Sequence, residues 1–420
     1  MSTKITGIYD ARKELGWGKS IIMGLQQCFA MFGATILVPV LTNSYGEGIV
    51  GLSASVTLFC AGVATLWFHF ITKGKVPVFL GSSFAFLGMY QAIIPQYGKE
   101  YATGGVVAAG GLYVILAILI KVLGTKRVMK LFPPAVCGPL IILIGINLAG
   151  SAIDNLFTNW VLGIVPILVI IICNTWGKGM IKIIPVLISL IVSYIVAIIM
   201  GAVLRWCQRV VCNGLVFPTS ICPSSMLMLS LLVWLLPLLP WLSTSATLWL
   251  SAPTTGKNYI ADPGLTRTLL GDGIGTSLAG LLGGPANTTY SENTGVVALT
   301  RVFDPFVMRI AAVMAIILSL SPKFEAVINS IPAAIIGGIS FVLYGMIAAT
   351  GIRTIVENQV DYVNMRNVLV AAIIMVSGLG FNTYPIIIGG VSFSGLACAA
   401  VFGIILNAIL PGKDYEFKED

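Results

Sequence analysis

Long apolar stretches recur along nearly the whole chain, from Ser20 to Leu410, and each could cross a hydrocarbon core about 30 Å thick. Only 10% of the 420 residues are charged, whereas a soluble domain carries about 25%. The sequence therefore excludes an ordinary soluble enzyme and predicts an all-α membrane protein that spans the lipid bilayer many times.

Fourteen spans are expected, near residues 20–41, 49–71, 76–94, 104–123, 132–150, 159–175, 181–203, 226–250, 268–283, 287–300, 305–321, 329–350, 367–379 and 394–410. With a cytoplasmic amino terminus and alternating spans, all but four of the 24 Lys and Arg residues lie on or near the cytoplasmic side. An excess of Lys and Arg on the cytoplasmic side orients membrane proteins. The chain is therefore expected in a bacterial-type inner membrane, or a plasma membrane, with both of its ends in the cytoplasm. The net charge of +8 is attributed to this orientation, and no nucleic-acid partner is expected.

Two halves of the chain resemble each other. The third segment contains the run Gly-Ser-Ser-Phe-Ala at 81–85, and the tenth contains Asn-Thr-Thr-Tyr-Ser at 287–291. The fifth and twelfth segments correspond at a constant offset, in the pairs Pro133 and Pro332, Ala135 and Ala334, Gly138 and Gly337, Ala149 and Ala348, and Ile153 and Ile352. This pattern predicts a 7+7 inverted repeat, with repeats at 20–203 and 226–410 between cytoplasmic segments at 1–19 and 411–420.

Segments three and ten do not read as continuous helices, because small and hydroxyl residues crowd into both. Non-helical backbone at membrane depth is tolerated only where protein covers it or where it lines a cavity. We therefore expect short strands to break these two segments. Matching breaks in the two repeats predict a substrate site at the repeat interface.

Ionisable side chains at membrane depth are costly, so each is a candidate functional residue. Glu292 is the strongest candidate, and its alternative role is to cap the helix that begins at Asn293, because helix amino termini favour negative charge. Asp272 is interpreted as a residue at the cytoplasmic mouth of the ninth segment or a helix cap, and the single histidine, His69, as part of the interfacial aromatic belt. A metal site or an enzyme active site needs several ligating or acid-base side chains, and the sequence offers one histidine and no second buried acid. Neither enzyme activity nor a cofactor is therefore expected.

The run 292–301 reads ENTGVVALTR and resembles the ENxGxxxxTR signature of the nucleobase-cation symporter-2 family, the nucleobase/ascorbate transporters. Further matches to the family's uracil branch lie at 29–34, 73–86, 262–265 and 344–345. Glu292, at the first signature position, also resembles this branch, since purine and ascorbate members usually carry an amide there. The similarity covers about residues 20–203 and 254–410.

The resemblance implies interleaved core and gate domains and uptake of uracil, or a related nucleobase, with the proton as the coupling ion. Backbone amides of Phe84 and Ser291 would meet the pyrimidine carbonyls, and Glu292 would accept from a ring N–H and carry the coupled proton. The expected substrate-binding set also includes Ser83, Ala34, Tyr290 and, on the gate side, Tyr344. The resemblance further implies a homodimer.

The eighth segment departs from the family. Uracil permeases usually carry a Glu-His-x-Gly motif there, whereas this chain has no acidic residue between Asp154 and Asp262. Joining the third base of each codon from Leu242 to Ala246 with the first two bases of the next permits Glu-His-Ile-Gly-Asp, the missing motif. One hypothesis is that residues 204–253 are read out of frame between two compensating shifts. The alternative is a divergent segment with its own coupling chemistry.

A smaller departure is Gln27, where related permeases often have histidine. Other readings of the function stay open: a permease for xanthine or another purine, an anion exchanger or channel on the same fold, and a protein that no longer transports.

Overall fold

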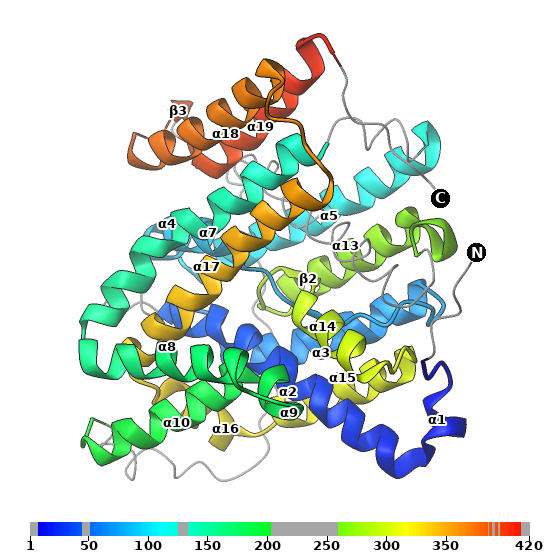
Figure 1. Ribbon diagram of the computed structural model, residues 1–420, viewed down its shortest axis with the longest axis vertical. Helices are drawn as coiled ribbons and strands as arrows, with labels where there is room; N and C mark the ends of the chain where they lie inside the picture. The colour runs from blue at the N-terminus through cyan, green and yellow to red at the C-terminus, as the bar shows by residue number, and fades with distance from the viewer. Residues whose placement is uncertain are drawn as a thin grey trace.

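The computed structural model describes residues 7–43, 51–124, 133–202, 259–384, 386–388, 391–393 and 395–412, and most of them are helical (Figure 1). The first half contains α1 (Ala11–Glu14), α2 (Gly16–Asn43), α3 (Ala54–Ile71), β1 (Leu80–Ser82), a 3-10 turn (Phe84–Phe86), α4 (Leu87–Tyr97), α5 (Lys99–Leu123), α7 (Pro134–Phe157), α8 (Trp160–Thr175), α9 (Met180–Ile183) and α10 (Pro185–Ile199). The second half contains a turn (Ile260–Gly264), α13 (Leu265–Leu281), β2 (Asn287–Thr289), α14 (Ser291–Thr300), α15 (Pro305–Ser319), α16 (Pro322–Asn329), α17 (Ala333–Glu357), α18 (Met365–Thr383), β3 (Ile386–Ile388), β4 (Val391–Phe393) and α19 (Gly395–Ile409). The unusual eighth segment lies outside the described residues.

Local sequence signals set many helix starts. Side chains of Ser53, Asn159, Asp304 and Asn364 cap α3, α8, α15 and α18 by accepting from backbone amides of the first turn. Proline occupies the first turn of α7, α10 and α15, where its missing N–H costs no helical hydrogen bond.

Six described helices are long and apolar enough to cross a membrane, namely α2, α3, α5, α7, α17 and α18. The pair α15 and α16, bent by 85°, counts as a seventh if it is taken as one span. The helices α8, α10 and α19 are apolar but shorter, and segments three and ten are each divided between a strand and a helix. The expected number of fourteen spans therefore stays a prediction, since length and composition identify at most seven among the described residues.

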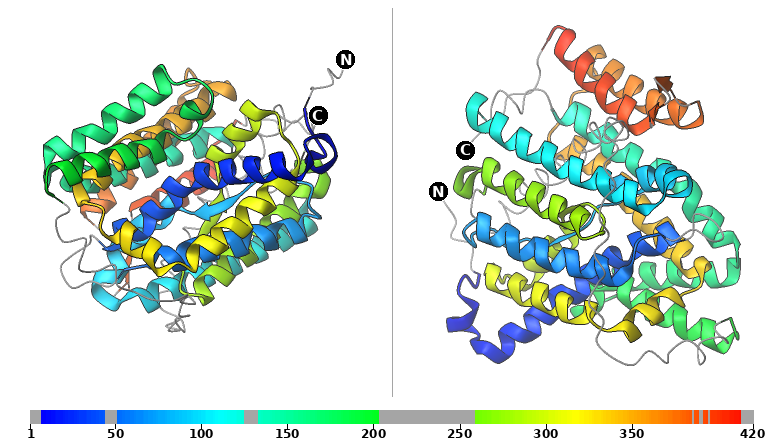
Figure 2. Two further views of the ribbon diagram at one scale, coloured as in Figure 1. Left: turned by 90° about the horizontal axis from the view of Figure 1, so that it is seen from below. Right: turned by 180° about the vertical axis from the view of Figure 1, so that it is seen from behind.

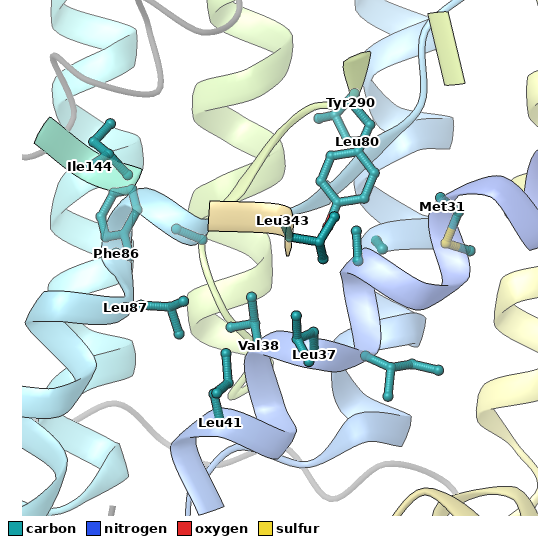
Figure 3. Packing of buried hydrophobic residues seen from close by; sticks show 14 of the residues in the cluster. Met31, Leu37, Val38, Leu41, Leu80, Phe86, Leu87, Ile144, Tyr290 and Leu343 are labelled. Carbon is teal, nitrogen blue, oxygen red and sulfur yellow. The ribbon is translucent and has the colours of Figure 1, made fainter. Parts of the chain in front are cut away.

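The helices pack in two groups that interleave along the sequence (Figures 1 and 2). In one group, α13 packs along α5 and α3, while α15 packs against α3 and α2. In the other, α17 packs along α7, and α8, α10, α18 and α19 surround this pair. A cluster of buried side chains joins the groups, and Figure 3 shows Leu37, Val38 and Leu41 of α2 within it, together with residues of β1, α4, α7 and α17.

The packing of α7 against α17 follows the symmetry of an inverted repeat. A Cβ built on Gly138 of α7 would lie 2.3 Å from the side chain of Ile355, and one on Gly337 of α17 would lie 2.3 Å from the backbone of Leu156. Gly337 follows Gly138 by 199 residues, and Ile355 follows Leu156 by the same number. The two contacts are thus equivalent, as a two-fold relation requires. The paired glycines in the sequence are points where the two helices lie in close contact.

Candidate functional site

The two strands β1 and β2 meet in the middle of the helices. They pair antiparallel, with Leu80 opposite Thr289 and Ser82 opposite Asn287. The hydrogen-bond ladder continues at both ends. Ser83 N–H donates to Ala286 O at 2.8 Å, and Tyr290 N–H donates to Phe79 O at 2.9 Å. A helical segment begins one residue after each strand, at Phe84 and at Ser291. Two helix amino termini, each with backbone amides that lack an intrahelical acceptor, therefore lie beside one strand pair.

Side chains of α3 complete the outer edge of β1. Leu80 N–H donates to Thr65 Oγ1 at 2.9 Å, and this hydroxyl lies 3.3 Å from Leu80 O. One helical turn later, His69 Nε2 lies 3.0 Å from Val78 O, so this nitrogen donates its proton to the carbonyl. Hydrocarbon provides no hydrogen bonds to a strand edge, so α3 acts here in place of a third strand.

The expected place of His69 in the interfacial aromatic belt is therefore wrong. Its side chain is only 2% exposed and binds the extended segment that leads into β1. The sequence pattern around it, Trp-Phe-His-Phe, is typical of an interface, but the contact partner comes from a segment nine residues later. Local pattern could not reveal that contact.

The helix α13 has the corresponding place beside β2. Thr276 Oγ1 donates to Asn287 O at 3.0 Å, which satisfies part of the outer edge of this strand. Asp272, one turn earlier, is 2% exposed and lies in the interior of α13. The interpretation of Asp272 as a residue at the mouth of the segment or a helix cap is wrong, because the helix begins seven residues earlier, at Leu265.

Tyr290 joins both strands to α2. Its hydroxyl donates to Ser82 O at 2.8 Å and accepts from Thr35 Oγ1 at 3.3 Å, while Ser82 Oγ donates to Thr35 O at 2.9 Å. A Cβ at Gly81 would lie 2.4 Å from the tyrosine ring, so only glycine allows the ring to cross β1 here. The Tyr290 hydroxyl thus fixes the pair of strands β1 and β2 against α2, and this pair with its two helix starts is called the strand crossing below. Thr35 and Ser82, which bond to this hydroxyl, are positioning residues that the sequence did not single out. Polar side chains on the buried face of a span were the available signal.

Other candidate residues lie around this crossing. Ala34 is 2% exposed on α2, next to Thr35, and Ser83 is 2% exposed between β1 and the following turn. The Phe84 ring meets the ring of Tyr344 on α17 edge to face, with centroids 6.3 Å apart. The structure therefore brings Phe84, from the broken third segment, into contact with Tyr344, which belongs to the helix group of α7 and α17.

Ser291 and Glu292 form the first turn of α14, directly after the crossing. Their side chains lie outside the described part of the structure, so the role of the Glu292 carboxylate stays a prediction. The next signature residue, Asn293, is fully buried, and its Nδ2 donates to Gln27 O and to Gln27 Oε1, both at 2.9 Å. An amide on α2 thus anchors α14 at the position where related permeases often carry histidine.

Comparisons with known proteins agree with the signature. The sequence model of the permease family that takes its name from xanthine and uracil permeases matches residues 18–387. The chain is 37% identical to the uracil permease of Bacillus subtilis (strain 168), over 96% of this chain and 95% of the relative. It is 34% identical to the putative pyrimidine permease RutG of Escherichia coli (strain K12), over 97% of this chain and 93% of the relative.

Solved structures show the same fold at low sequence identity. The transmembrane domain of the cyanobacterial bicarbonate transporter BicA superposes with a TM-score of 0.66 at 14% identity, over 96% of this chain and all of that one. The structure of SLC26A9 superposes with a TM-score of 0.68 at 10% identity, over 96% of this chain and 66% of that one. The fold is therefore the inverted-repeat type of helical membrane transporter, while the number of spans stays a prediction.

Proposed function

Because the chain belongs to the nucleobase cation symporter-2 family of permeases, we propose that it is a secondary active transporter that takes up uracil by proton symport. Membership of this family makes it an integral membrane nucleobase transporter rather than an enzyme. Uracil as the particular base, the proton as coupling ion and the absence of a bound cofactor belong to the proposal.

The observation that supports substrate binding at the strand crossing is the pair of helix starts beside it. Uracil is an uncharged imide ring that alternates carbonyl acceptors with N–H donors. In the proposed complex, the backbone amides of Phe84 and Ser291 donate to the carbonyls, and the Glu292 carboxylate accepts from a ring N–H. A base that leaves one of these buried groups unpaired is rejected, which provides specificity.

The residues around these three groups shape the pocket. Ala34 and Ser83 provide small side chains beside the strands, and Tyr344 closes the site from α17 against Phe84. Tyr290 contributes its ring and its main chain, since its hydroxyl is bonded to Ser82 and Thr35.

The two helix groups support core and gate domains, the group of α2, α3, α5, α13 and α15 forming the core and the group of α7, α8, α10, α17, α18 and α19 the gate. Fourteen spans, cytoplasmic ends in a bacterial-type inner membrane, and a homodimer complete the proposal. Proton-driven accumulation of uracil is impaired if the eighth segment has the printed sequence, because that segment lacks the carboxylate expected there.

Two other transport functions have specific support. A permease for xanthine or another purine fits the same family, and an anion exchanger fits the fold shared with BicA and SLC26A9. Identity to those two structures is 14% and 10%, against 37% to a uracil permease, which favours the nucleobase.

Uptake of labelled uracil into proteoliposomes tests the assignment, with and without an inward proton gradient and with excess xanthine or sulfate. Inhibition by unlabelled uracil alone supports the proposal. Inhibition by xanthine supports a purine permease, and inhibition by sulfate supports an anion exchanger. Calorimetric titration of the purified protein with uracil is the parallel measurement, and a chain that neither binds nor transports uracil contradicts the proposal.

A further inference from the structure

The amino-terminal segment is docked against the start of α15. Ile8 forms a parallel bridge with Val302, in which Ile8 N–H donates to Arg301 O and Phe303 N–H donates to Ile8 O, both at 2.8 Å. The Asp304 carboxylate joins two helix starts, because one oxygen accepts from Ala11 N–H at 2.8 Å and the other from Phe306 N–H at 2.9 Å. As a result, α1 and the first turns of α2 and α15 lie together at this end of the bundle (Figure 2).

Two arginines and a tryptophan surround Phe306 on this surface. The guanidinium carbon of Arg12, from α1, lies 4.6 Å from the centre of the Phe306 ring, and that of Arg309, from α15, lies 5.6 Å from it. Trp17, from α2, meets the same ring edge to face at 5.5 Å and is 64% exposed. Three separate elements therefore converge on one aromatic ring.

Neither arginine of this cluster forms an ion pair within the described part of the chain, and the Asp10 carboxylate acts on Arg12 only from beyond ion-pair distance. Among the residues that the structure describes, no carboxylate lies within 4.0 Å of the guanidinium of Arg12 or Arg309. Arg309 Nε is buried and has no hydrogen-bond partner within that part of the chain. Asp10 pairs with Lys13 at 3.2 Å, and Asp304 is bonded to the two backbone amides. Like charges held around one ring repel each other, so this cluster favours an anion with several acceptor oxygens.

An apolar face continues from the cluster along both helices. Ile21, Ile22 and Leu25 of α2, and Val313 and Ile317 of α15, are exposed large apolar side chains. Tryptophan beside such a face is typical of the boundary between headgroups and hydrocarbon. A ligand that matches both the arginine cluster and the apolar face has a phosphate that binds the arginines and acyl chains that cover the apolar face.

We propose that Arg12, Trp17, Phe306 and Arg309 form a binding site for an anionic phospholipid, with its phosphate between the two arginines and its acyl chains along α2 and α15. The site requires no particular transport substrate, so it stands apart from the assignment of uracil. It connects the lipid to the turn that follows α14, the helix that carries Glu292.

Thermal-shift titration of the detergent-purified full chain tests the proposal, with phosphatidylglycerol, phosphatidylcholine and inorganic phosphate as separate ligands. Phosphatidylglycerol is expected to raise the melting temperature, while phosphatidylcholine and inorganic phosphate leave it nearly unchanged. An equal shift with inorganic phosphate would identify a soluble anion as the ligand and overturn the lipid. An equal shift with phosphatidylcholine would show that the arginine charge is irrelevant.

Variants locate the site. Arg12→Gln and Arg309→Gln should each weaken phosphatidylglycerol binding about fivefold, and the double variant about 25-fold. The Lys variants at both positions keep the charge and should retain the preference for phosphatidylglycerol. Arg353→Gln is the matched control, since Arg353 is exposed and paired with Glu357 on α17. Arg12 is exposed, so its single variant reports on binding even if changes at Arg309 impair folding. Unchanged binding in Arg12→Gln, or an equal loss in Arg353→Gln, would overturn the proposal.

Discussion

Gly145 of α7 and Tyr344 of α17 are in contact across the axis that relates the two repeats, at positions 199 residues apart, the offset of the repeats themselves. A Cβ on Gly145 would lie 2.4 Å from Tyr344 O. Two residues at equivalent positions of the repeats can touch only where the two-fold axis that relates the repeats passes between them. A candidate pocket residue, Tyr344, therefore lies at a point where the two repeats are in close contact.

Gly145→Ala should destabilise the protein, because the new methyl group meets backbone atoms of α17 that cannot move aside independently. Overpacking of this kind costs about 1–3 kcal/mol, which should appear as a lower melting temperature of the purified protein. Gly150→Ala on the same helix is the matched control, since a Cβ there has no neighbour within 4 Å. Equal melting temperatures for the two variants would contradict the close contact.

Thr65→Val should weaken the edge of β1. The valine side chain has nearly the same shape but neither donates nor accepts, so Leu80 N–H is left buried without its partner, at a cost of about 1–3 kcal/mol. Thr65→Ser keeps the hydroxyl and should retain most of the stability and the uracil affinity. Thr350→Val is the control, because that exposed hydroxyl bonds only within its own helix. Thermal unfolding and uracil titration check the prediction, which fails if Thr65→Val behaves like Thr350→Val.

Glu292→Gln should weaken uracil binding at least about tenfold, because loss of a buried, charge-assisted hydrogen bond costs about 1.5–3 kcal/mol. The amide also presents a donor toward the ring N–H. Calorimetric titration of uracil into the purified variant measures the change, and Glu357→Gln, which alters an exposed carboxylate of α17, is the control. Unchanged uracil affinity in Glu292→Gln would remove this residue from the site.

The eighth segment provides a test of proton coupling. The printed chain should show little or no proton-driven accumulation of uracil, because the segment lacks the carboxylate expected there. It also contains Pro237 and Pro240, and proline is destabilising in a helix interior. Replacing residues 204–253 by the in-frame translation should restore accumulation in proteoliposomes.

The nucleotide sequence of the gene decides between the two accounts of this segment. Stop codons in the other frame, or a frame that does not encode Glu-His-Ile-Gly-Asp, would exclude the frame hypothesis. Strong pH-dependent uptake by the printed chain would show instead that Glu292 or another group couples protons without that motif.

Sequence reasoning identified the membrane class, the corresponding residues of the repeats and the family, because each depends on local information. Apolar length, residue spacing such as Gly138 to Gly337, and the signature that begins at Glu292 can all be read along the chain. For the same reason, the strands β1 and β2 overlap the two runs of small and hydroxyl residues at 81–85 and 287–291.

Contacts between distant segments could not be read in this way. The register of Leu80 against Thr289, the bond from His69 to Val78 and the burial of Asp272 each depend on which segment lies alongside. A polar side chain in an apolar helix has the same local sequence whether it faces lipid or a strand edge. Only the tertiary structure decided between these environments, because a backbone group that is cut off from water must take its hydrogen bond from whatever the fold places beside it.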